Sequence, residues 1–187
     1  MALGGWGEAE ASRLVGPLGR RWGHVQAVAD CADQIATPLG LDREVLATAA
    51  WLHDVGYAPE LRDVGFHPVD GARHLRRCRI DELIVSLVAH HSWAVCEARV
   101  RGFEASFLTE FARPPQDYAD ALCYCDMTNG PDGQPIDAAD RLDEIQARYG
   151  PGHTVTQFVD LARDDILASV ARVETALRVS ESQALDR

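Results

Sequence analysis

The sequence predicts an all-α fold, a globular bundle of roughly eight helices. Apolar residues recur with a period of about 3.6 along most of the chain, strand patterns are weak, and glycine and proline separate the periodic segments. The 187 residues, of which 47% are hydrophobic and 25% charged, suit one domain with a sizeable core. We therefore expect a single domain over residues 1–187.

The first half of the chain predicts three helices. The first begins near Trp22 and stops at the proline and glycine of "TPLG". The second covers residues 43–54, with Asp42 as its N-cap and Gly56 as its terminator. The third covers residues 67–78, "HPVDGARHLRRC", and has a proline in its first turn, where the missing N–H costs little.

The second half predicts a long amphipathic helix followed by shorter elements. Residues 79–100 carry the clearest helical periodicity, and residues 115–127 form a short helix that ends near Asp126. A turn-rich loop, "TNGPDGQP", follows at residues 128–135. Residues 136–180 or thereabouts are expected to form a helical extension, either a lid or a dimer surface.

Composition excludes several classes of function. The formal net charge of −11 disfavours a long nucleic acid as a partner. All 18 basic residues are arginine, which excludes Schiff-base chemistry and a Walker-type phosphate loop. No segment approaches the roughly 18 apolar residues of a membrane span, and the sequence does not start like a signal peptide. The five cysteines form no CxxC pair and are expected to be buried thiols, so we expect a cytoplasmic protein with no membrane partner.

An adjacent imidazole and carboxylate mark the end of the second predicted helix. His53 is in phase with Leu46 and Ala49, so it is expected to point into the core, and Asp54 follows it directly. Burying an unpaired polar group costs on the order of 1–3 kcal/mol. Both side chains therefore need partners.

Two further histidines lie in the long amphipathic segment. With Ile80 at 0° and about 100° per residue, His91 falls at about 20°, near the centre of the apolar stripe. His90 falls at about 280°, at the edge of the stripe. His91 is thus expected to point inward, and His90 stays open as a group that reaches the same region from the flank.

His24 begins the first predicted helix, and Asp126 ends a later one. Several imidazoles and two carboxylates converging on one core favour bound metal ions, because metals take neutral imidazole and ionised carboxylate ligands. Asp54, which adjoins a candidate ligand, is suited to contact two ions and is the candidate catalytic residue.

The ordered set of His24, His53 with Asp54, and Asp126 resembles the HD-domain superfamily of metal-dependent hydrolases. "FHPVDGARHL" is similar to a family segment in which a histidine precedes Gly-Ala, which nominates His67 as a ligand. "VAHHSWA" is similar to the segment that supplies the next histidine, His91 or its neighbour His90. The resemblance spans about residues 20–127. It implies an HD-type bundle that holds two divalent metal ions, with iron, manganese or another transition metal left open.

The resemblance also implies a phosphorylated substrate, although one position departs from it. Many HD phosphohydrolases read HDxGK, whereas this chain reads "HDVGY", with Tyr57 in place of lysine. Arginine grips phosphate bidentately, so Arg73 and Arg77 are candidate substrate contacts, with His74 near the pocket. The same cluster could instead be a solvated helix face. A second arginine pair, at residues 20–21, precedes the first candidate ligand.

The preferred hypothesis is a metal-dependent phosphohydrolase acting on a small phosphorylated molecule such as a nucleotide. Two ions would lower the pKa of a water and supply hydroxide for in-line attack at phosphorus. A mixed-valent di-iron oxygenase of HD type is one alternative, because the same ligands suit iron and other divalent ions alike. A non-catalytic protein that binds a nucleotide or metal is another. A homodimer is also left open.

Overall fold

The computed structural model describes residues 3–185 and consists of helices joined by short connections. The α-helices are α1 (Leu3–Val15), α2 (Arg20–Ala36), α3 (Arg43–Leu52), α4 (His67–Arg77), α5 (Glu82–His90), α6 (Ala94–Val100), α7 (Glu104–Glu110), α8 (Gln116–Met127), α9 (Ala138–Tyr149) and α10 (Thr154–Leu185). Short 3₁₀ helices are η1 (Gly16–Leu18), η2 (Val55–Tyr57), η3 (Pro59–Leu61) and η4 (His91–Trp93). Within residues 3–185 there is no β-strand, so the all-α prediction is confirmed.

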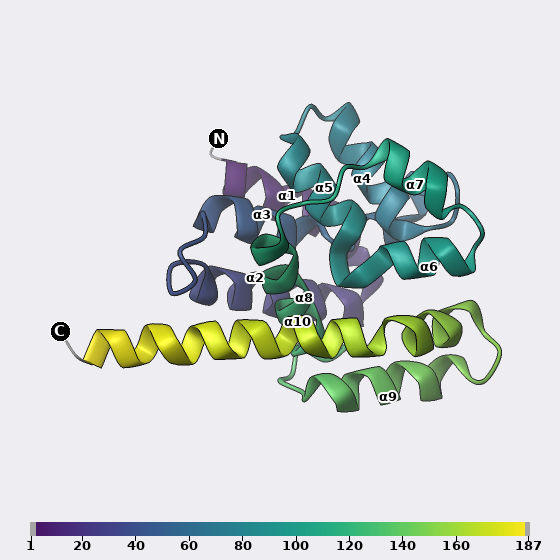
Figure 1. The fold of residues 1–187 in the computed structure, drawn as a ribbon. Coiled ribbons are helices and arrows are strands. Elements are labelled where there is room, and N and C mark those ends of the chain that lie inside the picture. The colour runs from purple at the N-terminus through teal and green to yellow at the C-terminus, as the bar shows by residue number, and fades with distance from the viewer. Residues whose placement is uncertain (1–2, 186–187) are drawn as a thin grey trace.

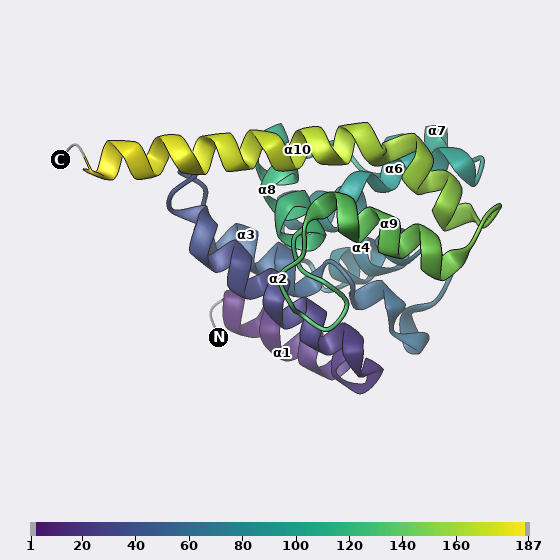
Figure 2. The ribbon, with the colours of Figure 1, turned by 90° about the horizontal axis from the view of Figure 1, so that it is seen from below.

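The core lies where the helices of the first two-thirds of the chain meet. α3 packs against α1, α2 and α5, while α8 contacts α2 and α3 on one side and α10 on another (Figure 1). α9 and α10 form an antiparallel hairpin, and the last turns of α10 project beyond the bundle (Figure 2). The segment expected as a helical extension is therefore packed on the bundle through α8 and α6.

The start of α3 is as predicted, but its end is not. The Asp42 side chain accepts hydrogen bonds from the N–H groups of Glu44 and Val45, at 2.9 and 3.1 Å. α3 ends at Leu52, before the predicted terminator Gly56, which lies in η2. A Cβ atom at Gly56 would lie 1.9 Å from the carbonyl oxygen of His67. The glycine is needed for the close approach of η2 to α4 rather than to end a helix.

The single helix predicted over residues 79–100 is wrong. α5 ends at His90, and α6 begins at Ala94 after a turn in which Ser92 and Trp93 have φ values of 48° and 62°. These left-handed conformations break the ladder of helical hydrogen bonds. The Trp93 indole N–H donates to Ser169 Oγ of α10 at 3.0 Å, which anchors the turn. Tertiary contacts thus override the uniform apolar pattern of the segment.

The predicted set of helices was also incomplete. α1 and α7 were not predicted, and α10 continues to Leu185, past the expected end near residue 180. α1 contains Gly4 and Gly7, which weaken helix propensity, and it buries only a narrow face. In residues 3–185, no helix is both long enough and apolar enough to cross a membrane.

Candidate metal centre

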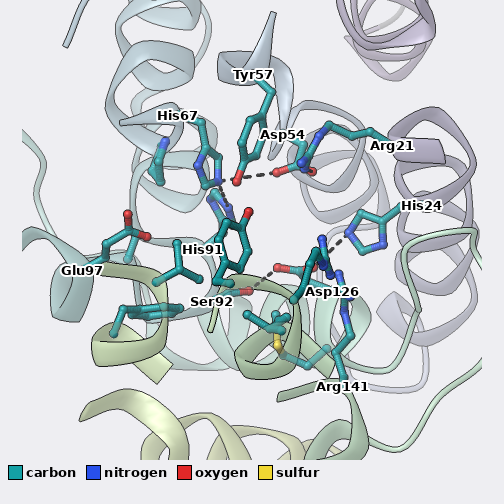
Figure 3. Close-up of a pocket in the computed structure, with 18 residues that line it drawn as sticks. Arg21, His24, Asp54, Tyr57, His67, His91, Ser92, Glu97, Asp126 and Arg141 are labelled. Carbon is teal, nitrogen blue, oxygen red and sulfur yellow. Dashed lines mark hydrogen bonds and ion pairs between the residues drawn. The ribbon is translucent and has the colours of Figure 1, made fainter. Parts of the chain in front are cut away.

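Six of the predicted ligands come together as two adjacent groups of three. One group is formed by His24, His53 and Asp126, the other by Asp54, His67 and His91. Within each group, one potential ligand atom of every member lies within 4.8 Å of the others. The residues come from α2, the end of α3, α4, the α5–α6 turn and α8, so elements far apart in the sequence must pack together to assemble them. Figure 3 labels all of them except His53.

Asp54 belongs to the second group and also lies next to the first. Its Oδ2 atom is 3.7 Å from Nε2 of His53, and its Oδ1 atom is 3.5 Å from Nε2 of His67. Nε2 of His67 is in turn 3.1 Å from Nε2 of His91. One carboxylate oxygen therefore faces each group.

Three imidazoles are held by the nitrogen that faces away from the centre. In each of them Nδ1–H donates to a backbone carbonyl. His24 donates to Gly130 at 3.1 Å, His53 to Ala50 at 2.7 Å, and His91 to Val88 at 2.6 Å. This fixes the ring orientations and turns every Nε2 toward the centre, the arrangement seen for metal-bound histidines.

Nε2 of His53 is the atom that argues most directly for a metal. It is buried, the residue is fully inaccessible to solvent, and within residues 3–185 this nitrogen has no hydrogen-bond partner. A buried nitrogen lone pair without a partner is costly. Together with the carboxylates beside it, it fits a site for a divalent ion.

The electrostatics keep most of these groups in the form that a metal requires. Burial lowers the pKa values of His53 and His67, which favours neutral imidazoles. Burial would raise the pKa of Asp54, but Arg21 and the imidazoles outweigh it and hold that pKa well below its usual range. Burial is likewise outweighed at Asp126, where the His24 hydrogen bond lowers the pKa. The carboxylates are therefore ionised.

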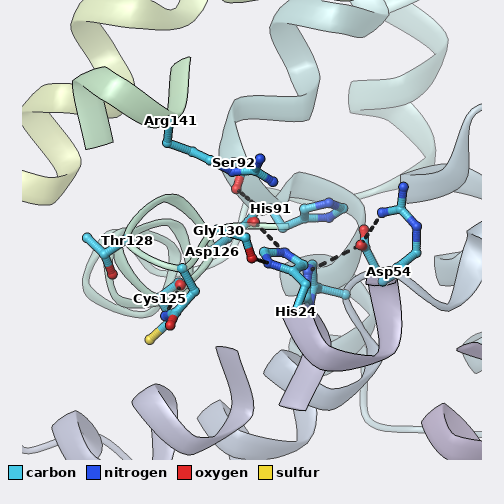
Figure 4. Close-up of polar contacts among 12 residues, drawn as sticks. His24, Asp54, His91, Ser92, Cys125, Asp126, Thr128, Gly130 and Arg141 are labelled. Carbon is cyan, nitrogen blue, oxygen red and sulfur yellow. Dashed lines mark hydrogen bonds and ion pairs between the residues drawn. The ribbon is translucent and has the colours of Figure 1, made fainter. Parts of the chain in front are cut away.

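His24 is the exception among the imidazoles. Burial lowers its pKa, but the hydrogen bond and charge of Asp126 outweigh burial and raise it. Nε2 of His24 lies 3.0 Å from Oδ1 of Asp126 (Figure 4). A metal ion bound by both groups would replace the proton shared between them.

Two segments outside the ligand set orient its members. The predicted loop at residues 128–135 supplies the Gly130 carbonyl to His24 and is tied to α2 by the Arg20–Asp132 ion pair. Ser92, in the left-handed turn after His91, donates its hydroxyl hydrogen to Oδ2 of Asp126 (Figure 4). Such partners of ligands fix orientation and tune the centre.

Tyr57 lies in the pocket beside the centre, between two other side chains. Its ring stacks on His67 with centroids 3.9 Å apart. The Arg21 guanidinium also lies over the Tyr57 ring, 3.4 Å from its centroid. Arg21 also forms an ion pair of 2.5 Å with Asp54. Burial and the nearby Asp54 charge raise the pKa of the phenol, so Tyr57 is a neutral donor.

The C-terminal hairpin, which was expected to be a lid or a dimer surface, also lines the pocket, although none of its residues was predicted as a site residue. α9 contributes Arg141, Ile145, Arg148 and Tyr149, and α10 contributes Val155 and Phe158. The α9 residues recur at intervals of three or four and so share one helix face. That spacing was readable in the sequence, but nothing in it indicated which face would meet the centre.

Four predicted site residues lie elsewhere. Nε2–H of His90 donates to the Phe111 carbonyl at 3.1 Å, and the ring packs on Phe107, so the structure does not bring His90 to the centre. Because His90 lies at the edge of the apolar stripe of α5, its side chain faces Phe107 and Phe111 rather than the candidate centre. The other three are α4 residues: Arg73 pairs with Glu110 and Asp63, His74 bonds Glu10, and Arg77 is exposed, all outside the pocket. The alternative interpretation, that these α4 arginines form a solvated helix face, fits their positions.

Comparisons with known proteins agree with this architecture. The HD domain family matches residues 21–122, which is more than half of the chain. Ribonuclease Y of Mesoplasma florum is 33% identical over 101 residues, covering 50% of this chain and 20% of that protein. Ribonuclease Y of Mycoplasma mycoides is 35% identical over 92 residues, covering 45% and 22%. Ribonuclease Y of Rubrobacter xylanophilus is 36% identical over 69 residues, covering 36% and 13%.

The chain thus spans less than a quarter of the length of these relatives. No solved structure matches it. The matched region contains five of the six clustered residues and ends just before the sixth, Asp126. The fold, the paired ligand groups and the match over residues 21–122 lead to one conclusion: the chain belongs to the HD-domain family.

Proposed function

We propose that this protein is a metal-dependent phosphohydrolase that acts on a small phosphate ester, such as a nucleotide, at a centre of two divalent ions. HD domains are typical of metal-dependent phosphohydrolases. The observation that carries the proposal is the pair of adjacent three-residue groups joined by Asp54. His24, His53 and Asp126 would hold one ion, and Asp54, His67 and His91 the other.

The ions, when bound, would lower the pKa of a water to near neutrality and neutralise charge on the phosphate. The protein groups around them prepare the site for that chemistry. The imidazoles are held by backbone carbonyls, so they need no rearrangement to present Nε2. In the net reaction, water oxygen bonds to phosphorus, the P–O ester bond breaks, and the leaving alcohol takes a proton.

Three arginines support an anionic substrate. Arg21, Arg141 and Arg148 line the pocket next to the two ligand groups. Guanidinium groups bind phosphate oxygens through paired hydrogen bonds and stabilise the charge that develops during phosphoryl transfer. Glu97 also lines the pocket, but its charge is paired with Arg101. Arg21, Arg141 and Arg148 are therefore the cationic groups of the pocket.

The relatives support cleavage at phosphorus but not the size of the substrate. They are named ribonucleases, and the chain matches only a small part of each. The net charge of −11 disfavours a long nucleic acid here. We therefore propose a small phosphate ester as the partner, a cytoplasmic location, and iron, manganese or another transition metal as the native ion.

A comparison of two Asp→Asn variants tests the proposal. The full chain would be loaded with Mn²⁺ or Fe²⁺ and assayed for phosphate release from p-nitrophenyl phosphate and nucleoside monophosphates. Removal of groups that only support a ligand costs about 10–100-fold, so Asp54→Asn should lower kcat/KM by about 100-fold or more. Asp33→Asn, at an exposed ion pair with Arg43, should leave it unchanged.

The same preparations should contain about two metal ions per wild-type chain by elemental analysis. Metal-loaded protein that releases no phosphate from any ester would contradict the hydrolase. A mixed-valent di-iron signal with oxygen consumption would point instead to an HD-type oxygenase.

A further inference from the structure

A second depression adjoins the candidate metal centre. It is lined by Leu18, Arg20, Arg21, His24, Pro131, Arg141 and Arg148. Four of these residues, Arg21, His24, Arg141 and Arg148, also line the pocket at the centre. The two hollows are therefore neighbours, and these four residues form their shared border.

The second depression is positive in a strongly acidic protein. Its four arginines are paired with Asp132, Asp54 and Glu144, and the last of these serves both Arg141 and Arg148. Four guanidinium groups thus face three carboxylates, which leaves one positive charge unbalanced among these described residues. A concave surface with excess positive charge concentrates anions.

Arg141 is the member that points most clearly to a ligand. Only 7% of the residue is exposed, and its Nε atom is buried without a hydrogen-bond partner within residues 3–185. Its Nη1 group donates a hydrogen bond to Glu144 at 2.6 Å, which fixes the guanidinium beside the depression. Guanidinium groups donate through a rigid fork, and a phosphate oxygen would complete the donor set of this one.

Glu144 also orients the second arginine. It accepts hydrogen bonds from Nε and Nη2 of Arg148 at 3.0 and 2.6 Å. Both arginines come from α9, which lies beyond the part of the chain that matches the HD family. They are therefore a feature of this chain's C-terminal hairpin and not of the matched domain.

We propose that Arg141 and Arg148 form a second anion subsite, which binds a phosphoryl group next to the one held at the metal centre. The proposal rests on the phosphohydrolase function above and names its substrate class as compounds with two linked phosphoryl groups, such as a nucleoside diphosphate. Linked groups are favoured because the two hollows share a border.

Binding of inorganic pyrophosphate to metal-free protein tests the subsite without any need for turnover. Isothermal titration calorimetry would compare wild type with Arg141→Gln and with Arg163→Gln. Arg163 links α10 to Asp143 and Gln146 of α9 but lines neither hollow, so its loss would only loosen the hairpin. We expect pyrophosphate affinity to fall about tenfold or more in Arg141→Gln, as one charge-assisted hydrogen-bond pair is lost, and to be unchanged in Arg163→Gln.

The inference is overturned if Arg141→Gln binds pyrophosphate like wild type, or if both variants lose affinity equally. Should Arg141→Gln fail to fold by circular dichroism, Arg148→Gln replaces it, because that side chain is 40% exposed and its loss should be tolerated. A smaller loss of affinity is expected for Arg148→Gln. If its affinity for pyrophosphate equals that of wild type, the inference is overturned.

Turnover separates the two proposals. With metal-loaded protein, Arg141→Gln should lower kcat/KM for adenosine diphosphate about tenfold more than it lowers kcat/KM for p-nitrophenyl phosphate, because only the diphosphate has a second phosphoryl group for the subsite. Equal losses on both substrates would overturn the subsite while keeping the hydrolase. If wild type hydrolyses neither compound but Arg141→Gln still loses pyrophosphate binding, the hydrolase fails and the anion subsite stands.

Discussion

At the scale of single residues, the environment of each ring nitrogen separates the clustered histidines from their neighbours. His90 and His91 are adjacent in sequence and both are buried. His91 donates from Nδ1 to the Val88 carbonyl of α5 and turns Nε2 toward the centre, whereas Nε2–H of His90 donates to Phe111. Burial alone therefore does not identify the ligand, and the hydrogen-bond partner does.

Alanine substitutions at His91 and His90 should affect different properties of the protein, the bound metal and the stability respectively. His91→Ala should lower the bound metal well below the wild-type content, because one of six ligands is gone. His90→Ala should keep the metal but lower the free energy of unfolding by about 1–3 kcal/mol, since the Phe111 carbonyl loses its donor. Elemental analysis and urea denaturation measure the two effects. Equal metal loss in both variants would contradict the assignment.

The sequence predicted the six clustered residues, but not always for the right geometric reason. The inward direction of His91 was derived from the phase of an unbroken helix, and the structure ends α5 at His90. His91 reaches the centre from the turn instead, with ψ at 144°. His90 was placed by its helical phase at the edge of the apolar stripe, and the α4 arginines by their clustering in the sequence. Neither signal determines which face of a helix meets the pocket.

At the scale of elements, the joining of α10 to α8 depends on a buried carboxylate. Asp120 of α8 accepts two hydrogen bonds from Arg172 of α10, both at 2.7 Å, and one from Gln116 at 2.8 Å. Burial raises its pKa, but the hydrogen bonds from Arg172, Ser169 and Gln116, with the Arg172 charge, together outweigh burial and lower the pKa. This carboxylate therefore stabilises the fold only while it is ionised.

Asp120→Asn should lower the free energy of unfolding by about 1–3 kcal/mol at pH 7. A carboxyl whose pKa is lowered by folding contributes stability above its unfolded pKa of about 3.9 and loses it as the pH falls through the folded value. The difference between wild type and variant should thus shrink below about pH 4. Urea denaturation at pH 7 and pH 3.5 measures it, with Asp33→Asn as the exposed control. A difference that does not change with pH would contradict the ion-pair account.

The elements that the sequence missed share a physical cause. α1 and α7 are weakly amphipathic or short, and their helical state depends on packing against residues far away in the chain. The break at Ser92 and Trp93 is set by contacts with Asp126 and Ser169, which no local pattern records. α3, with its Asp42 cap, and α4, with a proline in its first turn, were predictable because their signals are local.

At the scale of the whole molecule, the candidate ligands join four α-helices and one turn. A ligand that binds the folded state alone stabilises it by mass action, by about 2.7 kcal/mol at a hundredfold excess over Kd. For a chain of this size that raises Tm by about 5–10 °C. Mn²⁺ should therefore raise Tm in wild type, chelation should reverse the rise, and Asp54→Asn should show a smaller shift. Differential scanning calorimetry would measure it, and equal shifts in both proteins would contradict the site.

The α9–α10 hairpin also bears on how such a protein can change over evolution. The candidate ligands all lie before residue 127, whereas the roof of the pocket comes from residues 141–158. The candidate ligands and these lining residues of the hairpin are thus encoded in separate stretches of the gene. Insertion, exchange or drift in the second stretch can redirect the protein to new compounds while the first stays intact. The hairpin is accordingly the natural unit to swap when building chimeras between relatives.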